Sequence, residues 1–246
     1  MQLACSSNAF VRQSLAEALA AIAAIGYRAV EILADRPHLF PLDWVPGELR
    51  GLAGELERRG LAVASLNANT ACGYYPVTFW EPVFEPSLAN PEPAARRWRI
   101  DCTRRAVDLA HTLGAPLVTV TSGRLVPGID RPAALALLAD SLHEVLAHAS
   151  AAGVRIGIEY EPGLLVESAA DLLLLLAQLD SPWLGANLDL GHSHVAGEEP
   201  EPVITALAGR IFGVHLEDIA GRRHQHLVPG DGDLDFDRLG RAQAAA

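Results

Sequence analysis

Cysteine and basic residues are both scarce in this chain of 246 residues. The three cysteines, Cys5, Cys72 and Cys102, lie far apart and form no CxxC pair. This spacing gives no disulfide framework and no cysteine zinc site, and it fits a reducing cytoplasm. Lysine and arginine number 19 against 30 aspartate and glutamate, for a net charge of −11. Because an acidic surface repels phosphate backbones, no nucleic-acid partner is expected.

Long hydrophobic runs and nucleotide-binding glycine patterns are also missing. The first residues, MQLACSSNAF, do not show the basic start and apolar block of a signal peptide. The leucine run DLLLLLAQLD is too short to span a bilayer and carries a charge at each end, so no membrane partner is expected. Neither GxGxxG nor GxxxxGK[ST] occurs, which weakens the case for an open nucleotide-binding sheet.

Short apolar segments alternate with longer helical patterns along the whole chain. This rhythm predicts parallel strands covered by helices, an α/β fold. We expect one TIM (β/α) barrel domain over residues 1–246, with seven recognisable strands and the eighth apparently missing. The predicted strands are residues 2–7, 28–34, 61–68, 115–123, 155–163, 183–191 and 211–218.

Residues 69–95 interrupt the rhythm with a segment rich in proline and aromatic residues. Long loops in compact domains are often functional, so we expect this loop to cover the mouth of the barrel. Tyr74, Trp80 and Phe84 are its candidates for contact with a substrate, because closing such a loop would expel water from the site.

Metal-binding residue types recur at the ends of the predicted strands, where α/β barrels carry their chemistry. Glu159, Asp189 and His215 end three different strands. Carboxylates and imidazoles together are a ligand set for a divalent ion such as zinc, manganese or cobalt, with magnesium also possible. Glu161 points the same way as Glu159, because strand side chains alternate.

Simpler interpretations stand beside these for single residues. Glu161 at a strand end could cap a helix or pair with an arginine instead of contacting substrate. Glu31, inside RAVEILA, is expected to be a barrel-interior charge that pairs with an arginine. His194 and Glu198 are expected to be solvated loop residues, and Glu217 and Asp218 could be helix-capping or salt-bridged.

Four segments in order, IGIEYEPG, ANLDLGHSHVAGE, VHLED and HLVPGDGDLDF, resemble the xylose isomerase-like TIM-barrel superfamily of sugar-phosphate isomerases and epimerases. GYRAVEI is similar to the second strand of that family, and the resemblance runs from about residue 20 to 238. It implies that Glu159, Asp189 and His215 hold a divalent metal ion. It also implies that Glu159 is the first candidate for the catalytic base, with Glu161 as its substitute.

The resemblance assigns further residues near the metal. His192 matches a histidine that contacts substrate in the epimerases or binds another metal in the related apurinic-site endonucleases. His226 sits where those endonucleases carry a further metal-binding histidine, and His224 replaces their aspartate. Asn67 and Ser122 stand where their two earlier histidines would be. We therefore expect His192, His224, His226, Asn67 and Trp80 to contact substrate.

One departure from the family lies at the end of the sequence. Complete relatives continue past GDGDLDF to an eighth strand ending in a glutamate, a fourth metal ligand that is often also catalytic. This chain ends in DRLGRAQAAA and offers no such strand. Because a seven-stranded barrel leaves two strand edges unpaired, we expect a homodimer that covers this side.

The favoured function is a metal-dependent isomerase or epimerase of a small sugar, sugar phosphate or polyol derivative. Such an enzyme removes a proton next to a metal-polarised carbonyl. Two alternatives remain open: a metal-dependent hydrolase of a small phosphoester, related to the apurinic-site endonucleases, and a catalytically impaired barrel. A barrel can carry many chemistries, so the site must decide among them.

Overall fold

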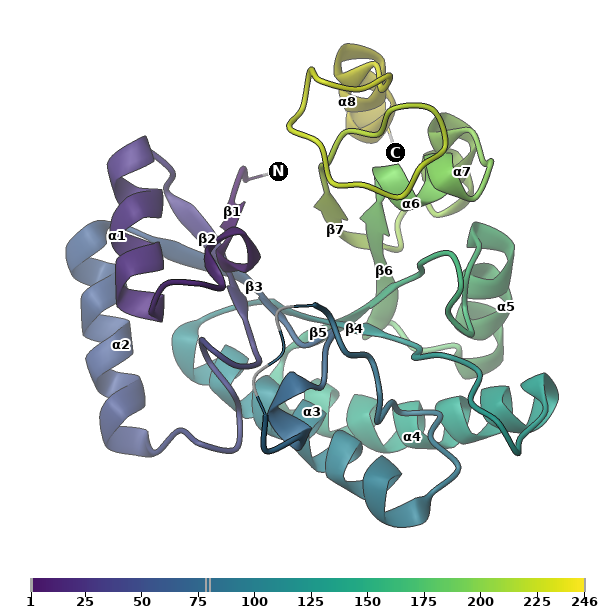
Figure 1. Cartoon of the computed structure of the whole chain (residues 1–246), viewed down its shortest axis with the longest axis horizontal. Coiled ribbons are helices and arrows are strands. Elements are labelled where there is room, and N and C mark those ends of the chain that lie inside the picture. The colour runs from purple at the N-terminus through teal and green to yellow at the C-terminus, as the bar shows by residue number, and fades with distance from the viewer. Residues whose placement is uncertain (1, 78, 80, 246) are drawn as a thin grey trace.

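A computed structural model describes residues 2–77, 79 and 81–245. Seven strands form one parallel sheet in the order β1 to β7, and the sheet curls with helices along its outer side (Figure 1). The strands are β1 (Cys5–Ser6), β2 (Ala29–Leu33), β3 (Ala62–Asn67), β4 (Leu117–Thr121), β5 (Arg155–Glu159), β6 (Leu184–Asp189) and β7 (Ile211–His215). The predicted α/β barrel class and its seven strands are confirmed.

Helices follow the strands as predicted, with two additions. They are α1 (Leu15–Ile25), α2 (Pro46–Arg59), α3 (Pro93–Leu113), α4 (Arg131–Ala152), α5 (Ala169–Leu179), α6 (Leu190–Val195), α7 (Pro200–Ala206) and α8 (Phe236–Ala245), with short 3-10 turns η1 (Ser7–Phe10) and η2 (Cys72–Tyr74). Sequence reasoning missed α6 and α8. Within the described residues, no helix has the length and apolar character needed to cross a membrane.

Local sequence signals set both ends of helix α1. Ser14 and Glu17 form a capping box, in which the Ser14 hydroxyl accepts from the Glu17 amide and the Glu17 carboxylate accepts from the Ser14 amide at 2.8 Å. Gly26 ends the helix at φ 110°, a conformation that favours glycine. Leu19 and Ile22 on one face are fully buried in the hydrophobic core. Local capping and one apolar stripe therefore fix this helix against the sheet.

The inner side of the curled sheet is unusually polar. Buried polar side chains on its strands include Glu31, Ser65, Asn67, Thr119 and Asn187. The interior of a TIM barrel is normally filled with branched apolar side chains. Since burying polar groups costs free energy unless they are hydrogen-bonded, this interior points to a site.

Strands β1 and β7 are the two edges of the sheet, and no eighth strand pairs with either among the described residues. The curvature of the sheet nevertheless brings β7 close to β2. His215 on β7 lies 3.0 Å from the carboxylate of Glu31 on β2, 184 residues away in sequence. A side-chain contact thus spans the side where strand pairing stops.

The long loop lies at the carboxyl ends of the strands, on the side predicted for it. Asn69, just after β3, hydrogen-bonds Glu159 at the end of β5. Farther along, Glu85 accepts a hydrogen bond from the amide of Arg124, which follows β4. The buried guanidinium of Arg99 donates to the carbonyls of Ala68, Asn69 and Thr70, which fixes the start of the loop.

His38 is a buried histidine whose charge state should make stability depend on pH. Its Nδ1 lies 3.0 Å from the Ser7 hydroxyl and its Nε2 lies 3.2 Å from the Gln13 carbonyl. Burial lowers the pKa of His38, and contacts with the carbonyls of Gln13 and Phe10 offset this only in part. The unfolded chain therefore binds a proton at His38 more readily than the folded chain does. The contribution of His38 to stability is full above pH 6.5 and is lost as the pH drops toward the folded pKa.

Replacing His38 by glutamine should reduce this acid sensitivity, because glutamine keeps hydrogen-bonding capacity but does not titrate. Thermal unfolding between pH 7.5 and 5 should show a smaller loss of Tm in His38→Gln than in the parent protein. His143→Gln, at an exposed position on α4, is the matched control and should behave as the parent does. An equal acid-induced loss in His38→Gln and parent would show that other groups set the effect.

Candidate active site and metal centre

Three predicted metal ligands meet at the carboxyl ends of β5, β6 and β7. Nδ1 of His215 lies 3.0 Å from a Glu159 oxygen and 3.9 Å from an Asp189 oxygen. One ligand atom of each residue lies within 4.8 Å of the other two. Asp189 and His215 are direct neighbours in the strand register, which explains their approach. The sequence prediction that these side chains converge agrees with this geometry.

This cluster fits a divalent cation by its chemistry. Glu159 and Asp189 are 5% and 4% exposed, and two buried carboxylates side by side require a positive charge for compensation. Two carboxylate oxygens and one imidazole nitrogen form a donor set that zinc and similar ions accept. Ligands from three strands leave coordination positions for water or substrate, as catalytic metal sites require.

The carboxylates around His215 favour its protonated form. Burial alone would lower the pKa of His215, but the carboxylates of Glu159 and Glu31 raise it well above its usual value. For Glu159, burial alone would raise the pKa, but His215 and hydrogen bonds hold it well below its usual range. Glu159 is therefore ionised near neutral pH and ready to act as a ligand.

Two asparagines that sequence reasoning missed hold Glu159 in position. Asn69 and Asn187 donate to the same Glu159 oxygen at 2.9 Å and 2.7 Å. Asn187 has its space because Gly213 lies beside it on β7, where a Cβ atom would come within 2.4 Å of the Asn187 oxygen. The alternation of strand side chains was the available signal, since Asn187 and Asp189 are two positions apart on β6.

Among the described residues, no arginine pairs with Glu31, contrary to the prediction. The carboxylate accepts hydrogen bonds from Ser6 at 2.9 Å and Ser65 at 2.8 Å, and it contacts His215. Asn67, expected to contact substrate, also donates to Glu31 at 3.3 Å and is itself buried. The prediction of an arginine failed because hydroxyl groups on adjacent strands satisfy this carboxylate.

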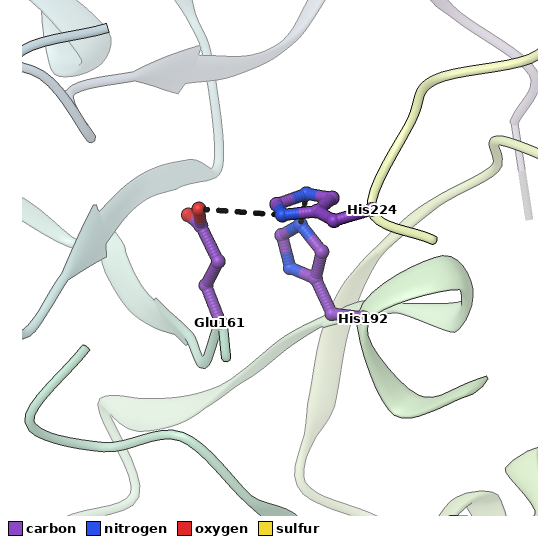
Figure 2. Close-up of side chains that lie close together, drawn as sticks. All are labelled: Glu161, His192 and His224. Atoms are coloured by element: carbon purple, nitrogen blue, oxygen red, sulfur yellow. Dashed lines mark hydrogen bonds and ion pairs between the residues drawn. The ribbon is translucent and has the colours of Figure 1, made fainter. Parts of the chain in front are cut away.

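A second group of ionisable side chains lies beside the metal cluster. Figure 2 shows Glu161 facing His224, with His192 directly beneath that imidazole. The Nε2 atoms of His192 and His224 are 3.1 Å apart, and Nδ1 of His224 is 4.0 Å from a Glu161 oxygen. Nδ1 of His192 faces the Tyr160 carbonyl at 3.0 Å, which leaves Nε2 directed into the site.

Glu161 has the properties of a proton carrier at neutral pH. Its carboxylate is largely buried, and burial raises its pKa to about 7, against an opposing effect of His192. Among the described residues its side chain forms no ion pair with an arginine within 4.0 Å, so that simpler interpretation is not supported. A group with a pKa near the working pH can both accept and donate a proton.

The remaining candidates lie farther out. His226 is 70% exposed at its side chain, and its imidazole contacts the carboxylate of Glu217. Burial lowers the pKa of His224, with a smaller effect of His192. The loop carrying both histidines is anchored by the buried Asp218, which accepts from four backbone amides.

The aromatic candidates of the long loop have mixed positions. Tyr74 is exposed and packs edge-on against Trp98 at 4.8 Å, while Phe84 lies beneath the guanidinium of Arg124. Trp80 lies outside the described residues. Contact of these side chains with a substrate remains a prediction.

A cavity of about 540 Å³ opens at the opposite end of the sheet. Arg155 and Ile211, the first residues of β5 and β7, line it together with Phe212. The amino ends of barrel strands serve stability, whereas chemistry belongs to the carboxyl ends. We therefore assign the active site to the polar cluster and not to this cavity.

A curled parallel sheet with ionisable side chains at its carboxyl ends defines an α/β-barrel enzyme. The chain belongs to the xylose isomerase-like TIM barrel family, whose sequence pattern matches residues 19–242. An uncharacterized protein of Methanocaldococcus jannaschii, MJ1311, is 26% identical over 96% of this chain and 77% of its own length. An inosose dehydratase of Bacillus thuringiensis is 27% identical over 54% of this chain and 54% of its own length.

Solved structures show the same fold. A D-tagatose 3-epimerase-like protein superimposes with a TM-score of 0.83 at 23% identity, covering 100% of this chain and 86% of that one. The IOLI protein, solved with a bound zinc atom, gives a TM-score of 0.80 at 20% identity over 99% of this chain and 84% of that one. At these identities the likeness establishes the fold alone.

Proposed function

We propose that this chain is a metal-dependent isomerase or epimerase of a small sugar, sugar phosphate or polyol derivative. One observation carries the proposal: Glu161 lies outside the three-ligand cluster, two residues from Glu159, and faces two imidazoles. The arrangement provides a metal-binding group and a separate proton carrier side by side. Reactions that begin by removing a proton next to a carbonyl need both.

Each side chain has a distinct part in this proposal. When bound, a divalent ion polarises a substrate carbonyl and a neighbouring hydroxyl. Glu159, Asp189 and His215 provide its ligands, and the two asparagines keep Glu159 oriented. Glu161 takes the proton from the carbon next to the carbonyl. His192, whose Nε2 lies 3.1 Å from that of His224, and His224 bind substrate hydroxyl groups and return a proton.

Glu159 and Glu161 have different roles in this proposal, although both were candidates for the catalytic base. Glu159 is held ionised by His215 and two amides, so it is a good ligand and a weak base. Glu161 has a raised pKa and no such partner, so it is the stronger candidate for proton transfer. The names of the D-tagatose 3-epimerase-like protein and the inosose dehydratase support a small sugar or polyol derivative as the substrate.

The test combines metal analysis with a substrate panel. Protein purified without added metal should contain, or take up, one divalent ion per chain. With zinc, manganese or cobalt in turn, it should exchange solvent deuterium into one of a panel of ketohexoses, ketopentose phosphates and inososes. A chain that binds no divalent ion, or that exchanges no substrate proton under any of these metals, would refute the proposal.

A metal-dependent hydrolase of a small phosphoester is the second candidate. Three further possible metal groups favour it: Glu161, His192 and His224; Glu217, His224 and His226; and Asp189, His192 and Glu217. Two-metal sites clamp phosphoester displacements. Two or three ions per chain, together with hydrolysis of p-nitrophenyl phosphate, would select this function over the isomerase.

We also propose a homodimer and a cytoplasmic location. The edge strand β7 is half-buried along its length, and Leu216 directly after it is 49% exposed. A second copy that covers β7 and β1 would bury these groups. Light scattering tests the assembly, and a sharp monomer at micromolar concentration would exclude it.

A further inference from the structure

The two ring nitrogens of His215 face different carboxylates. Nδ1 is directed to the metal cluster, 3.0 Å from Glu159 and 3.9 Å from Asp189. Nε2 is directed the opposite way, 3.0 Å from Oε2 of Glu31. The imidazole therefore stands between the cluster and a carboxylate that belongs to another part of the sheet.

Glu31 is held too firmly by other groups to act as a metal ligand itself. Oε1 accepts from the Ser6 hydroxyl and the Asn67 amide, and Oε2 accepts from the Ser65 hydroxyl as well as facing His215. These donors come from β1 and β3, the strands on either side of β2. The side chain is 6% exposed, so water does not compete for its oxygens.

An ionised carboxylate accepts hydrogen bonds and donates none. Both ring nitrogens of His215 face such a carboxylate, but only Nδ1 faces the cluster that would hold an ion. On binding an ion there, Nδ1 would give up its proton, and Nε2 would keep its own against Glu31. Metal-binding histidines commonly have such a partner on the second nitrogen, which fixes the tautomer and the ring orientation.

We propose that Glu31 is a positioning residue that fixes His215 in the tautomer presenting Nδ1 to the metal ion. The contact also ties edge strand β7 to β2 across the side where strand pairing stops. Glu31 thereby holds the orientation of His215 on the side of β7 where no further strand pairs. This inference rests on the proposed metal-dependent function.

The direct test is the tautomer of His215 in the zinc-loaded full chain. Two-bond proton–nitrogen correlation spectra of ¹⁵N-histidine-labelled protein distinguish a metal-bound nitrogen from a protonated one. We expect zinc on Nδ1 and the proton on Nε2 of His215, assigned by the signal lost in His215→Gln. Zinc on Nε2 would overturn the proposal, and this measurement needs no change to Glu31.

The second test is zinc affinity, measured by chelator competition. Glu31→Gln should bind zinc about 10–100-fold more weakly, because the glutamine amide can donate to Nε2 and shift the ring proton to Nδ1. Leu19→Ala is the matched control, since it truncates a fully buried side chain of the hydrophobic core on α1. It should lower Tm without changing zinc affinity by more than about twofold, which separates a positioning effect from a general loss of stability.

The outcomes separate this inference from the proposed function. If the parent protein binds no zinc, the proposed function fails. If the parent binds zinc and Glu31→Gln binds it with the same affinity, only the role of Glu31 fails. If Glu31→Gln and Leu19→Ala weaken zinc binding equally, the effect belongs to stability and the proposal is again refuted.

Discussion

Glu161→Gln is expected to lower kcat/KM by about 10²–10⁴-fold while the metal stays bound, because a positioned proton carrier contributes about that much to a rate. Glutamine has the shape of glutamate but cannot take a proton from carbon. The carboxylate of Glu161 lies outside the cluster of Glu159, Asp189 and His215, so zinc affinity should change little. The measurement is kcat/KM on the substrate identified in the panel, together with zinc content.

Glu167→Gln is the matched control for this variant. Glu167 is an exposed glutamate six residues farther along the chain, and among the described residues its carboxylate accepts only from the backbone amide of Gly163. It should keep the activity of the parent, since its charge is solvated. If Glu161→Gln keeps more than about a third of parental activity, Glu161 is not the proton carrier, and the role returns to Glu159 or to an imidazole.

The metal cluster could be predicted from the sequence for a simple geometric reason. Parallel strands end at the same edge of a sheet, so residues that end different strands meet without any knowledge of the loops. Glu159, Asp189 and His215 each end an apolar run. The alternation of runs and helical patterns likewise gave the seven strands, because core-facing periodicity survives small errors in the element boundaries.

The partners of these ligands could not be predicted in the same way. Glu31 and His215 are 184 residues apart, and their contact depends on how far the sheet curls. Asn69 reaches Glu159 from a loop whose path is set by the buried Arg99. A sequence pattern records which residues share a face but not the curvature or the loop path that brings two faces together.

The short helix α6 is an instructive omission. Leu190–Val195 continues directly from β6, and the glycine at 191 made the segment look like the end of a strand. The carboxylate of Asp189 accepts from the His192 amide at 3.0 Å and so caps this helix. Because residues two apart on a helix point to different sides, His192 faces the site while His194 contacts the Gly221 carbonyl.

Glu198 also differs from its expected role as a solvated loop residue. Its carboxylate accepts from the hydroxyl of buried Tyr160 at 2.9 Å and from the amide of Ala169 at 2.9 Å. It thus joins α5 to the segment after β5. The hydrophilic sequence around Glu198 gave no sign of this, because the two partners lie 38 and 29 residues earlier in the chain.

Glu159→Gln tests the metal-binding part of the site. Unlike Glu161→Gln, it should lose the metal together with the activity. It removes the negative charge that His215 and a divalent ion share, but it keeps the side-chain volume and an oxygen for Asn69 and Asn187. Loss of a partner that only orients a ligand costs about 10–100-fold in metal affinity, and loss of a charged ligand should cost more. We therefore expect zinc to be lost on dialysis and activity to fall with it.

Comparison of Glu159→Gln with Glu161→Gln separates the metal-binding role from the proton-transfer role. Glu159→Gln should regain part of its activity when zinc is raised far above the parental requirement, because Glu161 is intact, whereas no zinc concentration should restore Glu161→Gln. Glu144→Gln, which alters a partly exposed ion pair between α3 and α4, is the control for loss of a glutamate charge. If Glu159→Gln retains one zinc per chain after dialysis, Glu159 is not a ligand, and a metal centre of Asp189 and His215 would need another carboxylate.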